Sequence, residues 1–315
     1  MALLRVAYFG TPDFAVPGLE ALIASQHDVA VLVSQPDRPR GRGQRLQPTP
    51  TKVVAEAAGI PVLQPTRLKD ESFLNALRSF DLDLGVVAAY GRIIPDAVLA
   101  LPRLGLINIH ASLLPVWRGA APIHRAVING DRETGVTIMR VVTALDAGPT
   151  FAEARRAIGP DETTPEVERA LARLGAGLAV QVVDALAAGT AIETPQDDSR
   201  ATYANKIERG EGTIDWTQSA QRIHDLVRGL QPWPLVSATI GGLRCLIHRT
   251  EVTSEPTDAR AGTIAQASGG VLAVAGGDRR LLHILELQPE GRRPMPARDF
   301  LAGRRVELGA PLSNR

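Results

Sequence analysis

The first 189 residues alternate between short apolar runs and stretches with helical spacing, and this alternation restricts the fold more than any other feature. The apolar runs lie at residues 4–9, 29–34, 61–64, 82–90 and 106–109. A connection between parallel strands needs about a dozen residues or more and is usually a helix. The alternation therefore predicts an α/β domain whose sheet is doubly wound and mostly parallel.

The turn after the first apolar run limits the ligands of such a domain. It reads Gly10-Thr11-Pro12-Asp13 and contains a single glycine. A dinucleotide-binding fingerprint needs three glycines at this point of the fold. The layout is therefore Rossmann-like, but the sequence argues against an NAD site.

Residues 105–124, GLINIHASLLPVWRGAAPIH, are the stretch around which we expect a site to form. Asn108 and His110 lie two apart in a β-run, so the strand period directs both side chains to the same side. Pro115 cannot continue the strand, and we expect Arg118–Pro122 to open a helix whose first N–H groups are free for a ligand. The structural alternative is that Asn108 caps a turn and His110 is a hydrogen-bonded histidine of the core.

A carboxylate follows at the end of the next strand-like segment. Residues 135–142 lead into the tight turn Leu145-Asp146-Ala147-Gly148-Pro149. An amide, an imidazole and a carboxylate in one place can stabilise an oxyanion and move a proton. The presence of Asp146 thus favours a catalytic interpretation of Asn108 and His110.

At these motifs the chain resembles a known family. NIHASLLPVWRGAAPI followed by GVTIMRVVTALDAGP resembles the formyltransferases that use 10-formyltetrahydrofolate, and GTPDF, QPDRPRGRG, IDW and PWP extend the resemblance over nearly the whole chain. The resemblance implies that 10-formyltetrahydrofolate is the co-substrate and that Asn108, His110 and Asp146 are the catalytic residues. It also implies a folate pocket built partly from backbone groups of the loop Ser112, Leu113, Leu114 and Pro115.

The last third of the chain has a different pattern. Residues 190–205 are rich in Thr, Pro, Asp and Ser, and we expect them to be a linker after a catalytic domain at residues 1–189. Residues 206–315 contain one helical stretch and then five short strand-like runs separated by glycine pairs, at 236–240, 243–249, 262–266, 271–275 and 281–287. Five short strands are typical of a small β-barrel that is OB-like, a fold that often holds nucleic acid.

The resemblance also implies the acceptor. Family members with a second domain of this kind formylate the α-amine of initiator methionyl-tRNA, which implies a role in translation initiation. The segment around residues 36–47 is rich in Pro, Gly and Arg and predicts a long loop. Its basic residues are expected to grip the tRNA acceptor end, because guanidinium groups suit phosphates and unpaired bases; they are Arg38, Arg40, Arg42 and Arg45.

Other interpretations stay open at this point. A formyltransferase acting on glycinamide ribonucleotide or an amino sugar, or a hydrolase releasing formate, would share Asn108, His110 and Asp146. The chain could also be an RNA-binding module with an inactive formyltransferase domain. The basic segments could be solvated surface without a ligand.

Composition sets few further limits. The formal net charge is +1, so a polyanionic partner must bind to local basic patches.

The single cysteine, Cys245, excludes an internal disulfide and a multi-cysteine metal site, and it favours a cytoplasmic compartment. The histidines include no pair at metal-ligand spacing, so no metal is expected. The run MALLRVAYFG is too short for a signal peptide or membrane span, and we expect a cytoplasmic monomer.

Overall fold

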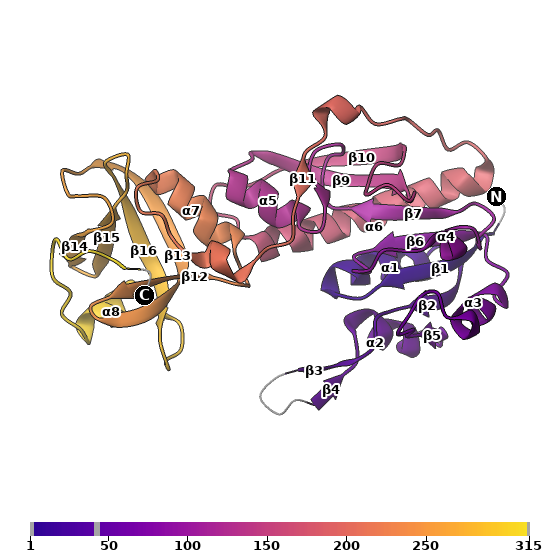
Figure 1. Cartoon of the computed structure of the whole chain (residues 1–315), viewed down its shortest axis with the longest axis horizontal. Coiled ribbons are helices and arrows are strands. Elements are labelled where there is room, and N and C mark those ends of the chain that lie inside the picture. Colours follow the sequence, from indigo (N-terminus) through magenta and orange to yellow (C-terminus); the bar gives the residue numbers. More distant parts are fainter. Residues whose placement is uncertain (1–2, 41–44, 314–315) are drawn as a thin grey trace. The chain divides into compact units, whose positions relative to one another are not determined.

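This computed structural model describes residues 3–40 and 45–313 and contains two compact units (Figure 1). The first unit comprises Met1–Pro122, Glu133–Arg156 and Glu168–Ala204, and the second comprises Ile123–Arg132, Ala157–Val167 and Asn205–Arg315. Two short segments that precede residue 168 thus belong to the second unit, and residues 190–204 belong to the first. A division in chain order at residues 189 and 206 stays a prediction.

The first unit is built on a seven-stranded sheet with the order β10-β9-β7-β6-β1-β2-β5 (Figure 1). Five of its strands, β1, β2, β5, β6 and β7, pair in parallel, and β9 pairs antiparallel with β7. The chain begins near the middle of the sheet and winds outward in both directions, so the predicted doubly wound, mostly parallel sheet is confirmed. The strands are β1 (Arg5–Gly10), β2 (Asp28–Val33), β5 (Val62–Leu63), β6 (Leu84–Ala88), β7 (Leu106–His110), β9 (Glu133–Arg140) and β10 (Thr150–Ala157).

Helices connect these strands and begin at the signals in the sequence. At the start of α2 the Thr49 side chain accepts a hydrogen bond from the main-chain nitrogen of Lys52, and Pro50 occupies the first turn. The helical segment after Gly10-Thr11-Pro12 begins with one 3-10 turn, η1. The bounds are η1 (Asp13–Ala15), α1 (Val16–Ile23), α2 (Pro50–Ala57), α3 (Glu71–Arg78), α4 (Asp96–Leu99), α5 (Pro122–Asn129) and α6 (Thr164–Ala188).

Helix α6 positions the strand that carries the motif residues. Among the described residues it is the one helix long and apolar enough to cross a membrane, but from Glu168 onward it belongs to the first unit. Gly175 allows the close approach: a Cβ at this position would lie 2.7 Å from Cγ2 of Ile109 in β7. We therefore describe α6 as a core helix; its buried residues include Leu171, Ala172, Ala176, Ala179, Val182 and Val183.

The basic segment after β2 forms a hairpin, where the sequence predicts a plain loop. Strands β3 (Arg38–Arg40) and β4 (Arg45–Gln47) pair antiparallel in a separate two-stranded sheet. The described side chains of the hairpin are exposed, including that of Leu46, so the sequence shows no alternation of buried and exposed positions here. At its base, Asp37 accepts hydrogen bonds from Lys52 Nζ and Gln64 Nε2, both 2.7 Å long. The base of the hairpin is thereby tied to the first unit.

The second unit closes into a small barrel. Its sheet has the order β12-β13-β16-β15-β14, with β17 paired to β16. Residues 309–313 join the two ends of this sheet: the nitrogen of Thr239 in β12 donates to the oxygen of Ser313 (2.7 Å), and that of Ile264 in β14 donates to the oxygen of Ala310 (3.0 Å). The last described residues thus bridge the two outer strands, and the predicted small β-domain of barrel type is confirmed. The bounds are β12 (Val236–Ile240), β13 (Leu243–Pro256), β14 (Ile264–Ser268), β15 (Val271–Ala275), β16 (Arg280–Pro289), β17 (Met295–Pro296), α7 (Ala220–Gly229) and α8 (Ala297–Ala302).

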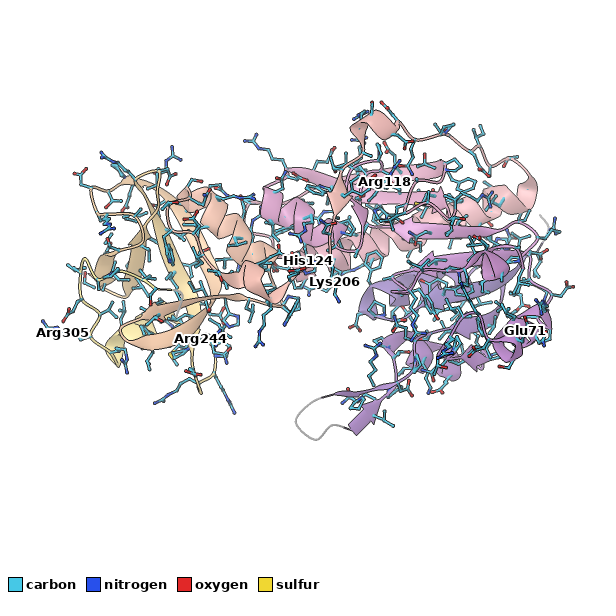
Figure 2. The ribbon with its side chains drawn as sticks, in the orientation of Figure 1. Glu71, Arg118, His124, Lys206, Arg244 and Arg305 are labelled. Carbon is cyan, nitrogen blue, oxygen red and sulfur yellow. The ribbon has the colours of Figure 1, made fainter. Side chains whose placement is uncertain are left out.

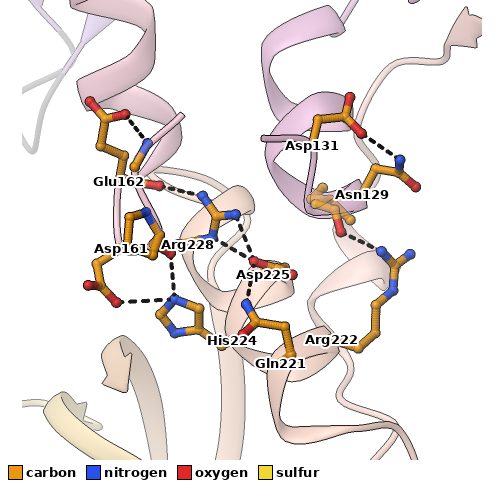
Figure 3. Close-up of polar contacts among 12 residues, drawn as sticks. Asn129, Asp131, Asp161, Glu162, Gln221, Arg222, His224, Asp225 and Arg228 are labelled. Carbon is orange, nitrogen blue, oxygen red and sulfur yellow. Dashed lines mark hydrogen bonds and ion pairs between the residues drawn. The ribbon is translucent and has the colours of Figure 1, made fainter. Parts of the chain in front are cut away.

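Helix α7 explains why two segments that precede residue 168 belong to the second unit (Figure 3). Nη1 of Arg222 donates a 2.5 Å hydrogen bond to the main-chain oxygen of Ile128. Arg228 is buried, forms a 2.7 Å ion pair with Asp225, and donates through Nη1 to the main-chain oxygen of Glu162 at 2.9 Å. The bonds from Arg222 to Ile128 and from Arg228 to Glu162 join long side chains to main-chain oxygens far away in the sequence. No periodic pattern predicts such bonds.

Candidate active site

Strand β7 carries Asn108 and His110 between β6 and β9. In the pairing register Asn108 lies opposite Val87 of β6 and Met139 of β9, and His110 lies opposite Thr137 of β9. His110 is buried, and Asn108 is partly exposed. Among the described residues the Asn108 side chain has no hydrogen-bond partner. Its amide N–H groups are thus available to a bound molecule.

The ring of His110 has a fixed orientation. Nε2 lies 3.0 Å from the main-chain oxygen of Trp117. Because a carbonyl oxygen only accepts, Nε2 must carry a hydrogen in this arrangement. The other ring nitrogen, Nδ1, lies 3.7 Å from Oδ2 of Asp146. The ring is therefore held with its second nitrogen beside a carboxylate.

Asp146 occupies the tight turn that follows β9. Its φ of +46° lies in the left-handed region, which aspartate adopts more readily than most residues. Oδ2 accepts a 2.8 Å hydrogen bond from the main-chain nitrogen of Gly119. The structure thus brings Asp146 to His110, and His110 shares a strand with Asn108, as the three predicted catalytic positions require.

The prediction that a helix opens at Arg118–Pro122 is wrong for Arg118 and Gly119. These two residues form a short strand, β8, paired in parallel with β11 (Tyr203–Ala204), and the helix begins only at Pro122. Gly119 has a φ of +121°, a conformation outside the helical region that glycine permits. The N–H groups expected to be free for a ligand form hydrogen bonds within the protein. That of Gly119 donates to the carboxylate of Asp146, and that of Arg118 donates to the main-chain oxygen of Thr202.

The loop Ser112, Leu113, Leu114, Pro115 is tied to β9 by one hydroxyl. Oγ1 of Thr137 donates to the oxygen of Ser112 (2.8 Å) and accepts from the nitrogen of Leu114 (3.1 Å). Ser112, Leu114 and Pro115 are buried. These main-chain groups are satisfied within the protein, so the loop has a defined shape, and its part in folate binding stays a prediction.

An amide donor, an oriented imidazole and a carboxylate suit acyl transfer. The amide can stabilise a developing oxyanion. The imidazole and the carboxylate can exchange protons with reacting groups. Among the described residues, no group of three or more His, Cys, Asp or Glu side chains could hold a metal ion.

Comparisons with known proteins decide the family. The sequence pattern described as "Formyl transferase" matches residues 4–183, and "Formyl transferase, C-terminal domain" matches residues 206–305. The chain belongs to the formyl transferase family.

Two relatives resemble this formyl transferase over nearly its full length. A methionyl-tRNA formyltransferase from Moorella thermoacetica is 46% identical over 300 residues, which is 95% of this chain and 96% of the relative. A methionyl-tRNA formyltransferase from Methylobacillus flagellatus is 47% identical over 301 residues, again 95% of this chain and 96% of the relative. Both comparisons extend through the C-terminal barrel.

A solved structure has the same fold. The sugar 3N-formyl transferase WlaRD, crystallised with dTDP and 5-N-formyl-THF, aligns with a TM-score of 0.69 and 14% identity and covers 93% of this chain and 100% of its own. At that identity the likeness concerns the fold alone. The acceptor of this formyl transferase must therefore be argued from other observations.

The sequence prediction assigns no role to two side chains of this formyl transferase's site, those of Gln196 and Arg118. Nε2 of Gln196 donates to the main-chain oxygens of Asp146 (2.8 Å) and Gly148 (2.7 Å). Arg118, which Figure 2 labels, is buried and donates through Nε (3.1 Å) and Nη2 (2.8 Å) to Oε1 of Gln196. Gln196 lies in the segment predicted as a linker, where polar residues without periodicity give no structural signal.

Proposed function

We propose that this formyl transferase moves the formyl group of 10-formyltetrahydrofolate to the α-amine of initiator methionyl-tRNA, which gives formylmethionyl-tRNA for translation initiation. The observation that carries the chemistry is the carboxylate of Asp146, held by the nitrogen of Gly119 at 2.8 Å and lying 3.7 Å from Nδ1 of His110. We propose methionyl-tRNA as the acceptor because relatives that match over nearly their full length are named methionyl-tRNA formyltransferase.

The transfer is an addition followed by an elimination. The neutral amine adds to the formyl carbon, and a C–N bond forms while the formyl oxygen becomes an oxyanion. The free amide of Asn108 donates a hydrogen bond to that oxyanion. The bond from the formyl carbon to N10 of the folate then breaks, and His110 supplies the proton that N10 takes up.

Asp146 accepts the proton that the amine loses. An aminoacyl α-amine has a reference pKa of about 7.7 to 8.0, so a large part of it is protonated at neutral pH and cannot attack. A carboxylate at the acceptor side removes that proton, directly or through a water molecule. The same carboxylate lies beside His110, so the proton can pass through it to the imidazole and on to N10.

The acceptor end of the tRNA is proposed to contact the β3–β4 hairpin. Arg38 is exposed, and its Nη2 donates to Oε1 of Gln35 at 3.0 Å. Arg40 and Arg45 lie in the paired strands, and Arg42 lies outside the described residues. Guanidinium groups on a hairpin with a fixed base can reach phosphates without reorganising the first unit.

The donor and the setting follow from the same proposal. The donor is 10-formyltetrahydrofolate, with Ser112, Leu113, Leu114 and Pro115 proposed to line its pocket. Translation initiation takes place in the cytoplasm, which is the compartment we propose, and one copy of the chain contains the whole proposed catalytic trio. We therefore propose a monomeric enzyme.

The test offers one donor and several acceptors. The purified chain is incubated with 10-formyltetrahydrofolate and, separately, with charged initiator methionyl-tRNA, glycinamide ribonucleotide, a nucleotide-linked amino sugar, or no acceptor. We expect formylmethionyl-tRNA as the product and no formylated small amine. Formylation of the sugar or of the ribonucleotide, release of formate without tRNA, or binding of tRNA without turnover would each replace the proposal with one of its alternatives.

A further inference from the structure

Residues 194–204, which we call the strap, run along the site in the first unit. Thr194 pairs with Thr150 at the start of β10. Further along, Oγ1 of Thr202 accepts a 2.9 Å hydrogen bond from the main-chain nitrogen of Trp117. The main-chain oxygen of Trp117 in turn accepts the hydrogen bond from Nε2 of His110. The strap ends at Ala204, in the strand that pairs with β8. It therefore contacts the segments that orient the catalytic residues.

Gln196 is the strap residue that reaches the turn of Asp146. Its side-chain nitrogen has two hydrogens, and they are donated to the main-chain oxygens of Asp146 and Gly148, at 2.8 and 2.7 Å. These two oxygens belong to the catalytic residue itself and to the residue two positions later. One amide group thus spans the turn.

Arg118 sets which way this amide points. Both of its bonds to Gln196 are made to Oε1, at 3.1 and 2.8 Å. A guanidinium group only donates, so the oxygen of the amide must face Arg118 and the nitrogen must face the turn. Arg118 is 4% exposed and is also paired with Asp198 at 2.6 Å. The orientation of the amide is therefore determined by a buried, doubly bonded partner.

The turn needs such support because packing does not provide it. Asp146 has a φ of +46°, and residues in sparsely populated backbone regions persist where their surroundings hold them. The preceding apolar residues do not anchor the turn, since Val142 is 37% and Leu145 is 59% exposed. The main-chain nitrogen of Arg140 donates to the oxygen of Pro149 at the end of the turn (2.8 Å). At Asp146 itself, hydrogen bonds from Gln196 to the main chain and from Gly119 to the carboxylate hold the turn.

We propose that Gln196, oriented by Arg118, is a positioning residue for Asp146. It touches no reacting atom and acts by keeping the carboxylate at its place beside His110. The inference rests on the proposed function of Asp146. A displacement of about 1 Å in a catalytic group can reduce turnover by about a hundredfold, so loss of this bridge should be visible in kcat.

The first experiment replaces Gln196 in the full chain by alanine and, separately, by glutamate. Gln196→Glu keeps the shape and the partner of Arg118 but sets an oxygen against the two main-chain oxygens of the turn. Both variants should lower kcat by about ten- to a hundredfold while KM for the folate, KM for the tRNA and the melting temperature stay unchanged. The matched control is Gln288→Glu, where the amide also donates to a main-chain oxygen, that of Arg292 at 2.9 Å, in the second unit. It should leave kcat unchanged.

The second experiment asks whether Gln196 acts through Asp146. Single-turnover rates are measured for Asp146→Asn, for Gln196→Ala and for the double variant. The proposal predicts that Gln196→Ala slows the wild type but not Asp146→Asn. An unchanged kcat in both Gln196 variants, or full additivity in the double variant, overturns the inference. A normal rate in Asp146→Asn overturns the function of Asp146 instead, so the two failures are distinguishable.

Discussion

The carboxylate oxygen Oδ2 of Asp146 accepts a 2.8 Å hydrogen bond from the main-chain nitrogen of Gly119. The same oxygen lies 3.7 Å from Nδ1 of His110, which is beyond hydrogen-bonding distance. In the part of the chain that the structure describes, Oδ1 has no hydrogen-bond partner. One oxygen is thus held by the protein, and the other is available to an incoming amine.

The packing of α6 against β7 predicts opposite effects for two glycines of one helix. A Cβ at Gly175 would lie 2.7 Å from Cγ2 of Ile109, whereas a Cβ at Gly177 would meet nothing within 4 Å. Gly175→Ala should destabilise the protein by about 1–3 kcal/mol through overpacking. Gly177→Ala should stabilise it by about 0.5–1 kcal/mol, because alanine favours the helix.

Thermal or urea unfolding of the two variants checks this prediction. Each is the control for the other, since the substitution and the helix are the same. Equal shifts in stability would show that the contact between Gly175 and Ile109 does not restrict the helix.

The hairpin arginines should matter for tRNA and not for folate. In a variant with Arg38, Arg40, Arg42 and Arg45 all replaced by alanine, kcat/KM for charged tRNA should fall at low salt, while the affinity for the folate donor stays unchanged. Each lost phosphate contact should reduce the slope of log affinity against log salt by about 0.7–0.9. The control is Arg78→Ala, an arginine of α3 that pairs with Glu71 in the same unit.

The measurement is initial rate at subsaturating tRNA over a range of salt concentrations. Equal rates for the wild type and the four-arginine variant at the lowest salt would exclude a tRNA-binding role of the hairpin.

The base of the hairpin should contribute to stability in a pH-dependent way. Hydrogen bonds from Lys52 and then from Gln64 hold the pKa of the Asp37 carboxyl below its ordinary value, and the bond to Asp37 raises the pKa of Lys52. Because the pKa of Asp37 is lower in the folded state, its carboxylate stabilises the fold at pH values above the unfolded-state pKa, and this stabilisation is lost as the pH falls through the folded-state pKa. Because the pKa of Lys52 is higher in the folded state, its ammonium group stabilises the fold until the pH rises through the folded-state pKa.

Asp37→Asn should therefore lower the free energy of unfolding between about pH 4 and pH 10, by less than about 1 kcal/mol because the pair is partly exposed. The difference from the wild type should shrink in stronger acid. Urea unfolding at several pH values measures it, and a difference that grows on acidification would show that the pair does not stabilise the fold.

Much of the fold and part of the site could be predicted from local patterns. The period of two in β7 predicts that Asn108 and His110 share a face, and the alternation of strands and helices predicts the sheet. Thr49 and Pro50 predict the start of α2 because capping depends on adjacent residues. The turn after residues 135–142 singled out Asp146, and the resemblance to a family implied its membership of the catalytic trio.

The remainder depends on contacts between distant main-chain groups. Gln196 is bonded to oxygens about fifty positions away, and residues 309–313 close the barrel through backbone pairing with β12 and β14. Neither segment has periodicity. The sequence predicts that Arg118–Pro122 opens a helix, but the φ of +121° at Gly119 is a property of the folded loop.

The most direct test of the account is a single-turnover measurement of formyl transfer with both substrates bound beforehand. The wild type and the variants Asn108→Ala, His110→Ala and Asp146→Asn are mixed with charged initiator methionyl-tRNA and 10-formyltetrahydrofolate, and formylmethionyl-tRNA is followed in time. We predict that each variant binds both substrates as the wild type does and transfers the formyl group about a hundredfold or more slowly. Transfer at the wild-type rate by His110→Ala or Asp146→Asn would contradict the account.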